Sequence, residues 1–161
     1  MKKTCLAVLC SLLAAACLTP LPEITTLPDI QLPVVSDKQE VWTSADYVKK
    51  PILMVFMGSW CPWCKRTMPA VMEAAATYGD KVEIVAVFMD NDAESVQAAI
   101  KEHGFTVKSV YAGQELAQVL EVNGLPHSIL FDKKHRAINH WEGFDPNRAE
   151  HFRNALEKVT K

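Results

Sequence analysis

The sequence has no excess of basic residues. Its 17 lysine and arginine residues are offset by 19 aspartate and glutamate residues, which gives a formal net charge of −2 at pH 7. A protein that binds nucleic acid typically carries a basic patch and a strongly positive charge. The composition therefore gives no indication of a nucleic-acid partner, and we expect none.

The sequence also lacks an internal repeat and a hydrophobic run long enough to cross a bilayer. No segment recurs at the period of a repeat architecture. The apolar run at residues 6–16 is shorter than the roughly 20 residues that a membrane-spanning helix needs. Hydrophobic residues make up 49% of the 161 residues and charged residues 22%, which are values typical of one globular domain.

The N-terminus has the pattern of a bacterial secretory signal. Lys2 and Lys3 precede the apolar run, and small residues end it, so we predict a signal peptide over residues 1–16. The last residues before Cys17 resemble a lipoprotein signal, in which the cysteine receives lipid and becomes the mature N-terminus. The alternative is ordinary cleavage after Ala16, where an A-x-A site also ends.

The distribution of cysteines favours lipid attachment. Cleavage would remove two of the cysteines, and lipid would block a third. One pair would then remain as free thiols, whereas an unmodified Cys17 would be an odd, exposed thiol in an oxidising compartment. The five cysteines, in chain order, are Cys5, Cys10, Cys17, Cys61 and Cys64.

A proline-rich segment follows the predicted signal. Residues 18–35 hold four prolines and no glycine, a composition typical of an extended, semi-stiff chain. We therefore predict a tether over residues 17–35 and a folded domain over residues 36–161. The second half of the tether is apolar enough to pack on the domain instead, and the sequence does not decide between the two.

The domain alternates strand and helix patterns, which predicts an α/β sandwich with a mixed sheet and helices on both faces. The two most apolar strands are expected to be buried on both faces. Asp145 is expected to cap the last helix and Pro146 to open it. Strands are predicted at residues 39–42, 52–57, 82–89, 106–111, 127–132 and 136–141, and helices at 61–78, 93–103, 115–122 and from 146 on.

The segment GSWCPWCKRTMP at residues 58–69 contains a C-x-x-C motif, Cys61 to Cys64. This motif serves metal binding as well as redox chemistry. A second C-x-x-C or an H-x-x-H that would complete a zinc site is missing, so a metal role would need a distant residue such as His127. A position at the start of a helix favours redox chemistry, because the unpaired N–H groups there stabilise a thiolate on Cys61. Cys64 lies within reach of that sulfur.

These features together resemble the thioredoxin-like proteins. The resemblance rests on W-C-x-x-C between a buried strand and a helix, on Pro69 five residues later, and on Gly124-Leu125-Pro126 before a late strand. It implies a thioredoxin-like three-layer α/β/α sandwich in which Pro126 is cis and packs beside the cysteines. The backbone next to that proline, at Leu125, would then bind the extended substrate.

Residues 90–123 have room for one inserted βα unit, and with the predicted export signal this resembles the TlpA-like thiol–disulfide oxidoreductases. The resemblance implies an envelope or periplasmic enzyme, mostly a reductant, with protein disulfides as substrates and a membrane thiol electron donor. Some such proteins serve cytochrome c maturation or disulfide repair. No bound cofactor and no metal are implied. The alternatives are a net oxidant or isomerase, and a metal-binding or metallochaperone module using Cys61, Cys64 and His127.

Several residues around the motif are candidates for contact with a partner. Trp60 flanks the active site in the family, and an exposed Trp63 between the cysteines suggests a partner contact. Pro62 suits the first helical turn and belongs to the same surface. His127 is a possible modulator of the thiolate, although a solvated or hydrogen-bonded strand histidine is the simpler interpretation.

Two positions depart from the family pattern. Val55 stands where cytoplasmic thioredoxins have an acid, and Thr67 stands where the TlpA-like group often has a glutamate. The resemblance associates both acids with proton transfer during thiol exchange. The acceptor for the Cys64 proton is therefore unassigned.

Overall fold

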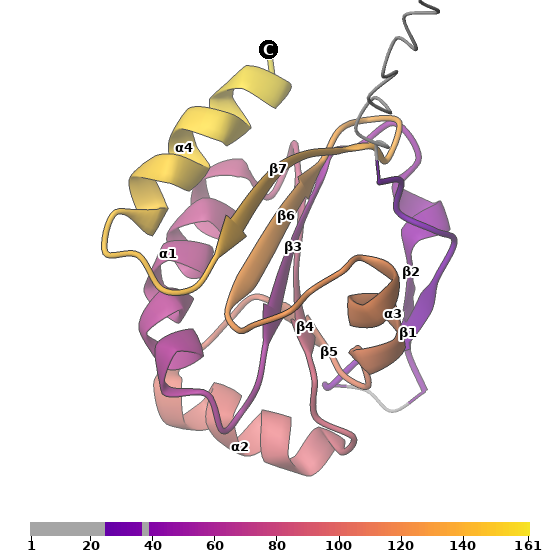
Figure 1. The fold of residues 1–161 in the computed structure, drawn as a ribbon. Helices are drawn as coiled ribbons and strands as arrows, with labels where there is room; N and C mark the ends of the chain where they lie inside the picture. The colour runs from indigo at the N-terminus through magenta and orange to yellow at the C-terminus, as the bar shows by residue number, and fades with distance from the viewer. Residues whose placement is uncertain (1–24, 37–38) are drawn as a thin grey trace, which may run out of the picture.

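The computed structural model describes residues 25–36 and 39–161. A mixed five-stranded sheet in the order β5-β4-β3-β6-β7 forms its centre (Figure 1). The central strands β3, β4 and β5 are parallel, while β6 and β7 run antiparallel to their neighbours. The sheet consists of β3 (Ile52–Met57), β4 (Glu83–Phe88), β5 (Lys108–Val110), β6 (His127–Phe131) and β7 (Ala137–Glu142).

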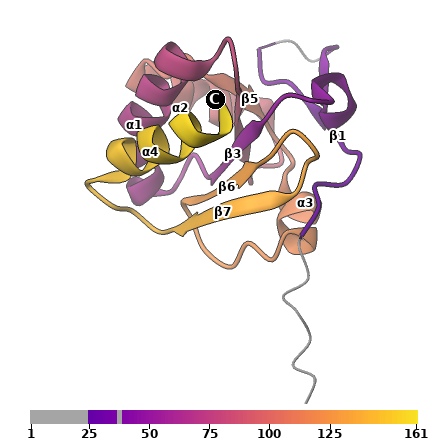
Figure 2. The same cartoon turned by 90° about the horizontal axis from the view of Figure 1, so that it is seen from above.

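Helices cover both faces of this sheet (Figure 2). One face carries α1 (Pro62–Tyr78), α2 (Ala93–His103) and α4 (Arg148–Val159). The other face carries α3 (Gln114–Val119) and a small antiparallel pair, β1 (Gln31–Pro33) and β2 (Val41–Thr43), which a 3₁₀ turn (Ser44–Tyr47) follows. The predicted three-layer sandwich is confirmed, and the segment in which one inserted βα unit was expected holds α2, β5 and α3.

Burial on both faces explains the apolar strands. Every residue of β3 and β4 is buried, and alternate side chains enter two separate clusters. Leu53, Val55 and Met57 belong to the cluster under α1 and α4, while Phe56 belongs to the cluster under the small sheet. The face of each residue therefore follows from its place in the strand.

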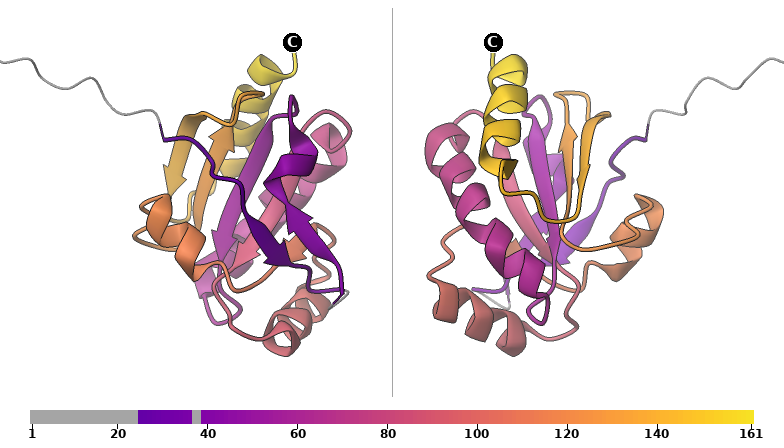
Figure 3. Two further views of the ribbon diagram at one scale, coloured as in Figure 1. Left: turned by 90° about the vertical axis from the view of Figure 1, so that its right-hand side faces the viewer. Right: turned by 60° about the vertical axis from the view of Figure 1, so that its left-hand side comes forward.

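The second half of the proline-rich segment packs on the domain as an arm, residues 25–36 (Figure 3). At one edge of the sheet the Leu27 N–H donates to the His135 carbonyl at 2.8 Å, and at the other Val35 N–H donates to the Ser109 carbonyl at 2.9 Å. Between them Leu32 is buried with 5% exposed. The boundary expected at residue 36 therefore falls inside the packed unit, because the apolar side chains of the arm complete the second cluster.

The start of the last helix also differs from the prediction. α4 begins at Arg148, and its capping residue Asn147 makes no side-chain cap hydrogen bond. Asp145 instead closes a tight turn, in which its Oδ1 accepts from the Asn147 N–H at 2.9 Å. The Asp-Pro pair thus forms the turn before the helix rather than its first residues. The predicted signal peptide, Cys17 and the first part of the predicted tether lie outside the described residues.

Candidate active site

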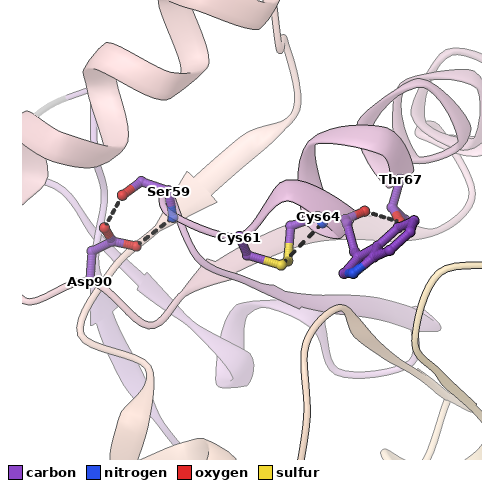
Figure 4. The surroundings of a disulfide bond; sticks show 6 residues. Ser59, Cys61, Cys64, Thr67 and Asp90 are labelled. Carbon is purple, nitrogen blue, oxygen red and sulfur yellow. Dashed lines mark hydrogen bonds between the residues drawn. A yellow bond between two sulfur atoms is a disulfide. The ribbon is translucent and has the colours of Figure 1, made fainter.

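The two cysteines lie where β3 ends and α1 begins. Cys61 is the capping residue of α1, and its Sγ accepts a hydrogen bond from the Cys64 N–H at 3.1 Å. The two residues form a disulfide with their Cα atoms 5.2 Å apart (Figure 4). Cys61 is 7% exposed and Cys64 is fully buried. When the bond is reduced, a thiolate on Cys61 would be stabilised by the unpaired N–H groups at the start of α1 and by the positive end of the α1 dipole.

The loop before Cys61 is held by Asp90, a residue that the sequence analysis missed. Asp90 follows β4 and is 5% exposed. One of its carboxylate oxygens accepts from the Ser59 N–H at 3.0 Å, and the other accepts from the Ser59 hydroxyl (Figure 4). β3 and β4 are parallel, so both end at the same edge of the sheet. Their predicted ends could therefore have indicated that Ser59 and Asp90 lie close together. The contact fixes the backbone that carries Trp60 and Cys61.

Both tryptophans of the motif are exposed, Trp60 by 61% and Trp63 by 50%. The Trp63 ring stacks on Phe144 with their centroids 5.5 Å apart. The guanidinium of Arg66 lies 4.9 Å from the centre of the Trp63 ring. Phe144 could not be predicted as a neighbour of the motif from the sequence, because it comes from the loop between β7 and α4. Pro62 is exposed at the first position of α1, where its missing N–H leaves no helical bond unmade.

The Leu125–Pro126 peptide bond is cis, as the resemblance implied. Pro126 is buried, and its carbonyl accepts from the Gly143 N–H at 2.8 Å. Leu125 packs against the cluster that contains both cysteines. The structure thus brings the start of β6 to the same region as the disulfide.

His127 does not point toward the cysteines. It is paired in register with Phe56, whose side chain lies in the opposite cluster from Cys61 and Cys64. It is 2% exposed, and its Nε2 lies 3.5 Å from Nδ1 of His140 on β7. A direct role in tuning the thiolate, or in binding a metal together with the cysteines, has no support in this geometry. Among residues 25–36 and 39–161, no group of three or more His, Cys, Asp and Glu side chains is placed to hold a metal ion.

Burial lowers the pKa of His127, and neighbouring His140 and Arg148 lower it further while Glu142 raises it. The unfolded chain therefore binds the proton more readily than the folded protein does. We expect the free energy of unfolding to fall as the pH drops below about 6.5, by at most about 1.4 kcal/mol per pH unit for this one proton. Urea titrations between pH 5 and 8 measure this. His127→Gln should flatten the dependence. Equal slopes in wild type and His127→Gln would contradict the assignment.

Neither of the two positions that depart from the family pattern, Val55 and Thr67, places a carboxylate near the disulfide. Val55 lies in the apolar cluster of the two cysteines. The Thr67 hydroxyl donates to the Trp63 carbonyl at 3.0 Å, one turn back in α1. At position 67, where the resemblance implied a carboxylate, the side chain is instead a hydroxyl that is engaged with the helix backbone.

None of the helices in the described part of the chain is both long and apolar enough to span a membrane. The anchoring expected from the sequence concerns Cys17, which lies outside that part.

Comparison with known proteins gives one family and several relatives. Residues 22–156 match the family described as Redoxin. The thiol-disulfide oxidoreductase ResA of Bacillus thuringiensis subsp. konkukian is 29% identical over 117 residues, which are 71% of this chain and 66% of that protein. The chain therefore spans just under two thirds of that relative's length.

Solved structures of other proteins share the fold. A protein described as a thiol:disulfide interchange protein DsbE from Chlorobium tepidum aligns with a TM-score of 0.78 at 21% identity, covering 86% of this chain and 97% of its own. The exposed lipoprotein thioredoxin Etrx1 of Streptococcus pneumoniae aligns with a TM-score of 0.69 at 20% identity, covering 82% and 100%. At these identities the likeness shows the fold alone. Together with the sequence matches, it confirms the resemblance that the sequence indicated.

Proposed function

We propose, from the premise that this chain belongs to the Redoxin family, that it is a thiol–disulfide oxidoreductase with Cys61 and Cys64 as its redox pair. The observation that carries the proposal is the disulfide at the N-terminus of α1, where the helix end stabilises a thiolate. The ResA relative, which is named a thiol-disulfide oxidoreductase, supports the same activity. The two sulfurs carry the electrons, so no bound cofactor is required.

The reaction in the reductive direction starts from the dithiol. The Cys61 thiolate attacks one sulfur of a substrate disulfide, and the other substrate sulfur leaves as a thiolate. Cys64 then loses its proton and attacks Cys61 Sγ, which releases the second substrate thiolate and forms the Cys61–Cys64 disulfide. The substrate gains two electrons and the enzyme loses them. A thiol donor at the membrane would return two electrons to the enzyme.

The substrate surface in this proposal surrounds the less buried sulfur. Trp60, Pro62 and Trp63 are exposed beside Cys61. Leu125 and the cis Pro126 lie at the start of β6. An extended segment of the substrate protein would lie between these two groups of residues, with its disulfide at Cys61.

We place the activity in the bacterial cell envelope, with Cys17 carrying lipid that anchors the chain to a membrane. The charged, apolar and small residues of the N-terminal sequence support this, and one structural neighbour is itself named a lipoprotein. The substrates would be protein disulfides met in cytochrome c maturation or in disulfide repair. The intact mass of protein extracted from membranes tests the anchor, because a mature chain with an unmodified Cys17 would exclude it.

The activity and its direction are tested together. We expect the reduced protein to reduce the disulfides of insulin, and Cys61→Ser to abolish this reduction. We expect a reduction potential nearer to that of thioredoxin, about −270 mV, than to that of a strong oxidant, about −120 mV, when measured against glutathione. Insulin reduction with a potential near the second value would make the protein a net oxidant. No reduction at all would refute the oxidoreductase proposal.

A further inference from the structure

We propose that the groove beside Trp63 binds a carboxylate side chain of the substrate protein, and that Arg66 is the group that recognises it. This inference rests on the proposed oxidoreductase function, because it names the substrates that the redox pair would meet. The groove has a volume of about 320 Å³. It lies between α1 and the turn that leads into α4, with Arg66, Ala70 and Glu73 on the first side and Phe144 and Arg148 on the second.

The guanidinium of Arg66 is held in one orientation by two aromatic rings. It lies 4.9 Å from the centre of the Trp63 ring and 6.0 Å from that of Phe144, and these rings stack on each other. A guanidinium that lies against aromatic faces keeps its N–H groups free along the edge. Such a preorganised edge suits the bidentate binding of a carboxylate.

The charges around the groove leave Arg66 uncompensated. Glu73 accepts from Arg153 at 2.8 Å, and Asp145 lies 3.0 Å from the ring nitrogen Nδ1 of His151. Lys65, next to Arg66, lies 3.9 Å from Glu102. Within the described residues, by contrast, no carboxylate forms an ion pair or a hydrogen bond with Arg66.

A second cation lines the same groove. Arg148 is 4% exposed, and its Nη2 donates to the carbonyls of Glu142 and Gly143, so its charge is fixed there. Asp145, which lines the groove as well, is a carboxylate that acts on the Arg148 charge. The groove thus has an arginine on each side, and the two carboxylates that also line it, Glu73 and Asp145, contact Arg153 and His151.

The position of Arg66 places the recognised group close to the reacting sulfur. Arg66 is two residues after Cys64 in α1, and Trp63 lies between the cysteines. A substrate segment that brings its disulfide to Cys61 and continues over Trp63 would reach the groove within a few residues. The proposal therefore predicts that preferred substrates carry a glutamate or aspartate near the attacked cysteine.

The test uses short peptides that contain one disulfide. Pairs differ only in Glu or Gln at a single position, two residues before the attacked cysteine in one pair and two residues after it in the other. The rate constant for oxidation of pre-reduced protein by each peptide is measured without any electron donor. We expect the Glu peptide of at least one pair to react about tenfold faster, the size of one charge-assisted hydrogen bond. Arg66→Gln should abolish this preference.

Two controls separate the possible outcomes. Lys65→Gln removes a neighbouring charge outside the groove and should keep the Glu preference. Bis(2-hydroxyethyl) disulfide is small and uncharged, so its rate constant with each protein measures the reactivity of Cys61 without the groove, and each peptide rate constant is divided by it. Equal rates with Glu and Gln peptides in wild type would overturn the inference while leaving the oxidoreductase function intact. An equal loss of preference in both variants would also overturn it, since diffuse charge would then suffice. Failure to reduce the uncharged disulfide would refute the proposed function itself, and this inference with it.

Discussion

Replacing Cys64 by serine is expected to stop the reaction at a mixed disulfide between Cys61 and the substrate. The two sulfurs differ in access, because Cys61 is 7% exposed and Cys64 is fully buried behind it. A substrate disulfide can therefore approach Cys61, while Cys64 can attack only the sulfur of Cys61, to which it is bonded in the structure. A serine hydroxyl is too weak a nucleophile to release the substrate.

The expected loss of turnover is large because the second step is intramolecular. A neighbouring thiolate acts at an effective concentration far above that of any thiol in solution. Without it, release of the substrate depends on an external thiol, and we expect turnover to fall by at least about 10³-fold. Non-reducing gels and mass spectrometry of Cys64→Ser should show a covalent adduct that dithiothreitol removes.

Cys61→Ser is the matched control. It keeps the other sulfur and the same charge, but of the two motif sulfurs it removes the one that a substrate can reach, so the motif should form no adduct. A stable adduct on Cys61→Ser and none on Cys64→Ser would reverse the order of attack. It would show that α1 opens enough to expose Cys64.

Local signals explain which elements could be predicted from the sequence. α2 has its predicted bounds because Asp92 caps it, with Oδ1 accepting from the Ser95 N–H at 2.8 Å, and Gly104 ends it in the left-handed conformation. The turn before β7 contains His135 at φ 59°, a left-handed conformation that histidine adopts more readily than most residues. The strand–helix junction at Cys61 followed in the same way from an apolar run and a proline at the first helical position.

The parts that could not be predicted depend on contacts between distant segments. β6 is buried on both faces, so its sequence has no polar alternation to show that His127 faces away from the cysteines. Only its register with Phe56 decides this. The Ser59–Asp90 contact and the stack of Trp63 on Phe144 join residues that are 31 and 81 positions apart, respectively, in loops whose geometry the fold determines. The arm depended on the same kind of information, because an apolar, proline-rich segment fits a tether and a packed strand equally well.

A charge introduced into that arm is expected to destabilise the whole domain. Leu32 in β1 is 5% exposed and is paired with Trp42, which is 2% exposed. Both belong to the cluster that fills the second face of the sheet. Leu32→Asp removes a buried leucine, at a cost of about 2–3 kcal/mol, and leaves a carboxylate in an apolar site or forces the arm away. We expect the free energy of unfolding to fall by about 4 kcal/mol, which is a large part of the stability of a domain of this size.

Urea unfolding of the oxidised protein, followed by tryptophan fluorescence, measures this change. Gln31→Asp is the matched control, because Gln31 is the neighbouring residue of the same strand and is exposed, so its replacement should change stability by no more than about 0.5 kcal/mol. A tether that only linked the domain to a membrane would make the two variants equal. Equal midpoints would therefore show that residues 25–36 are dispensable for folding, whereas the expected difference would make the arm part of the scaffold that positions β3 and the redox pair.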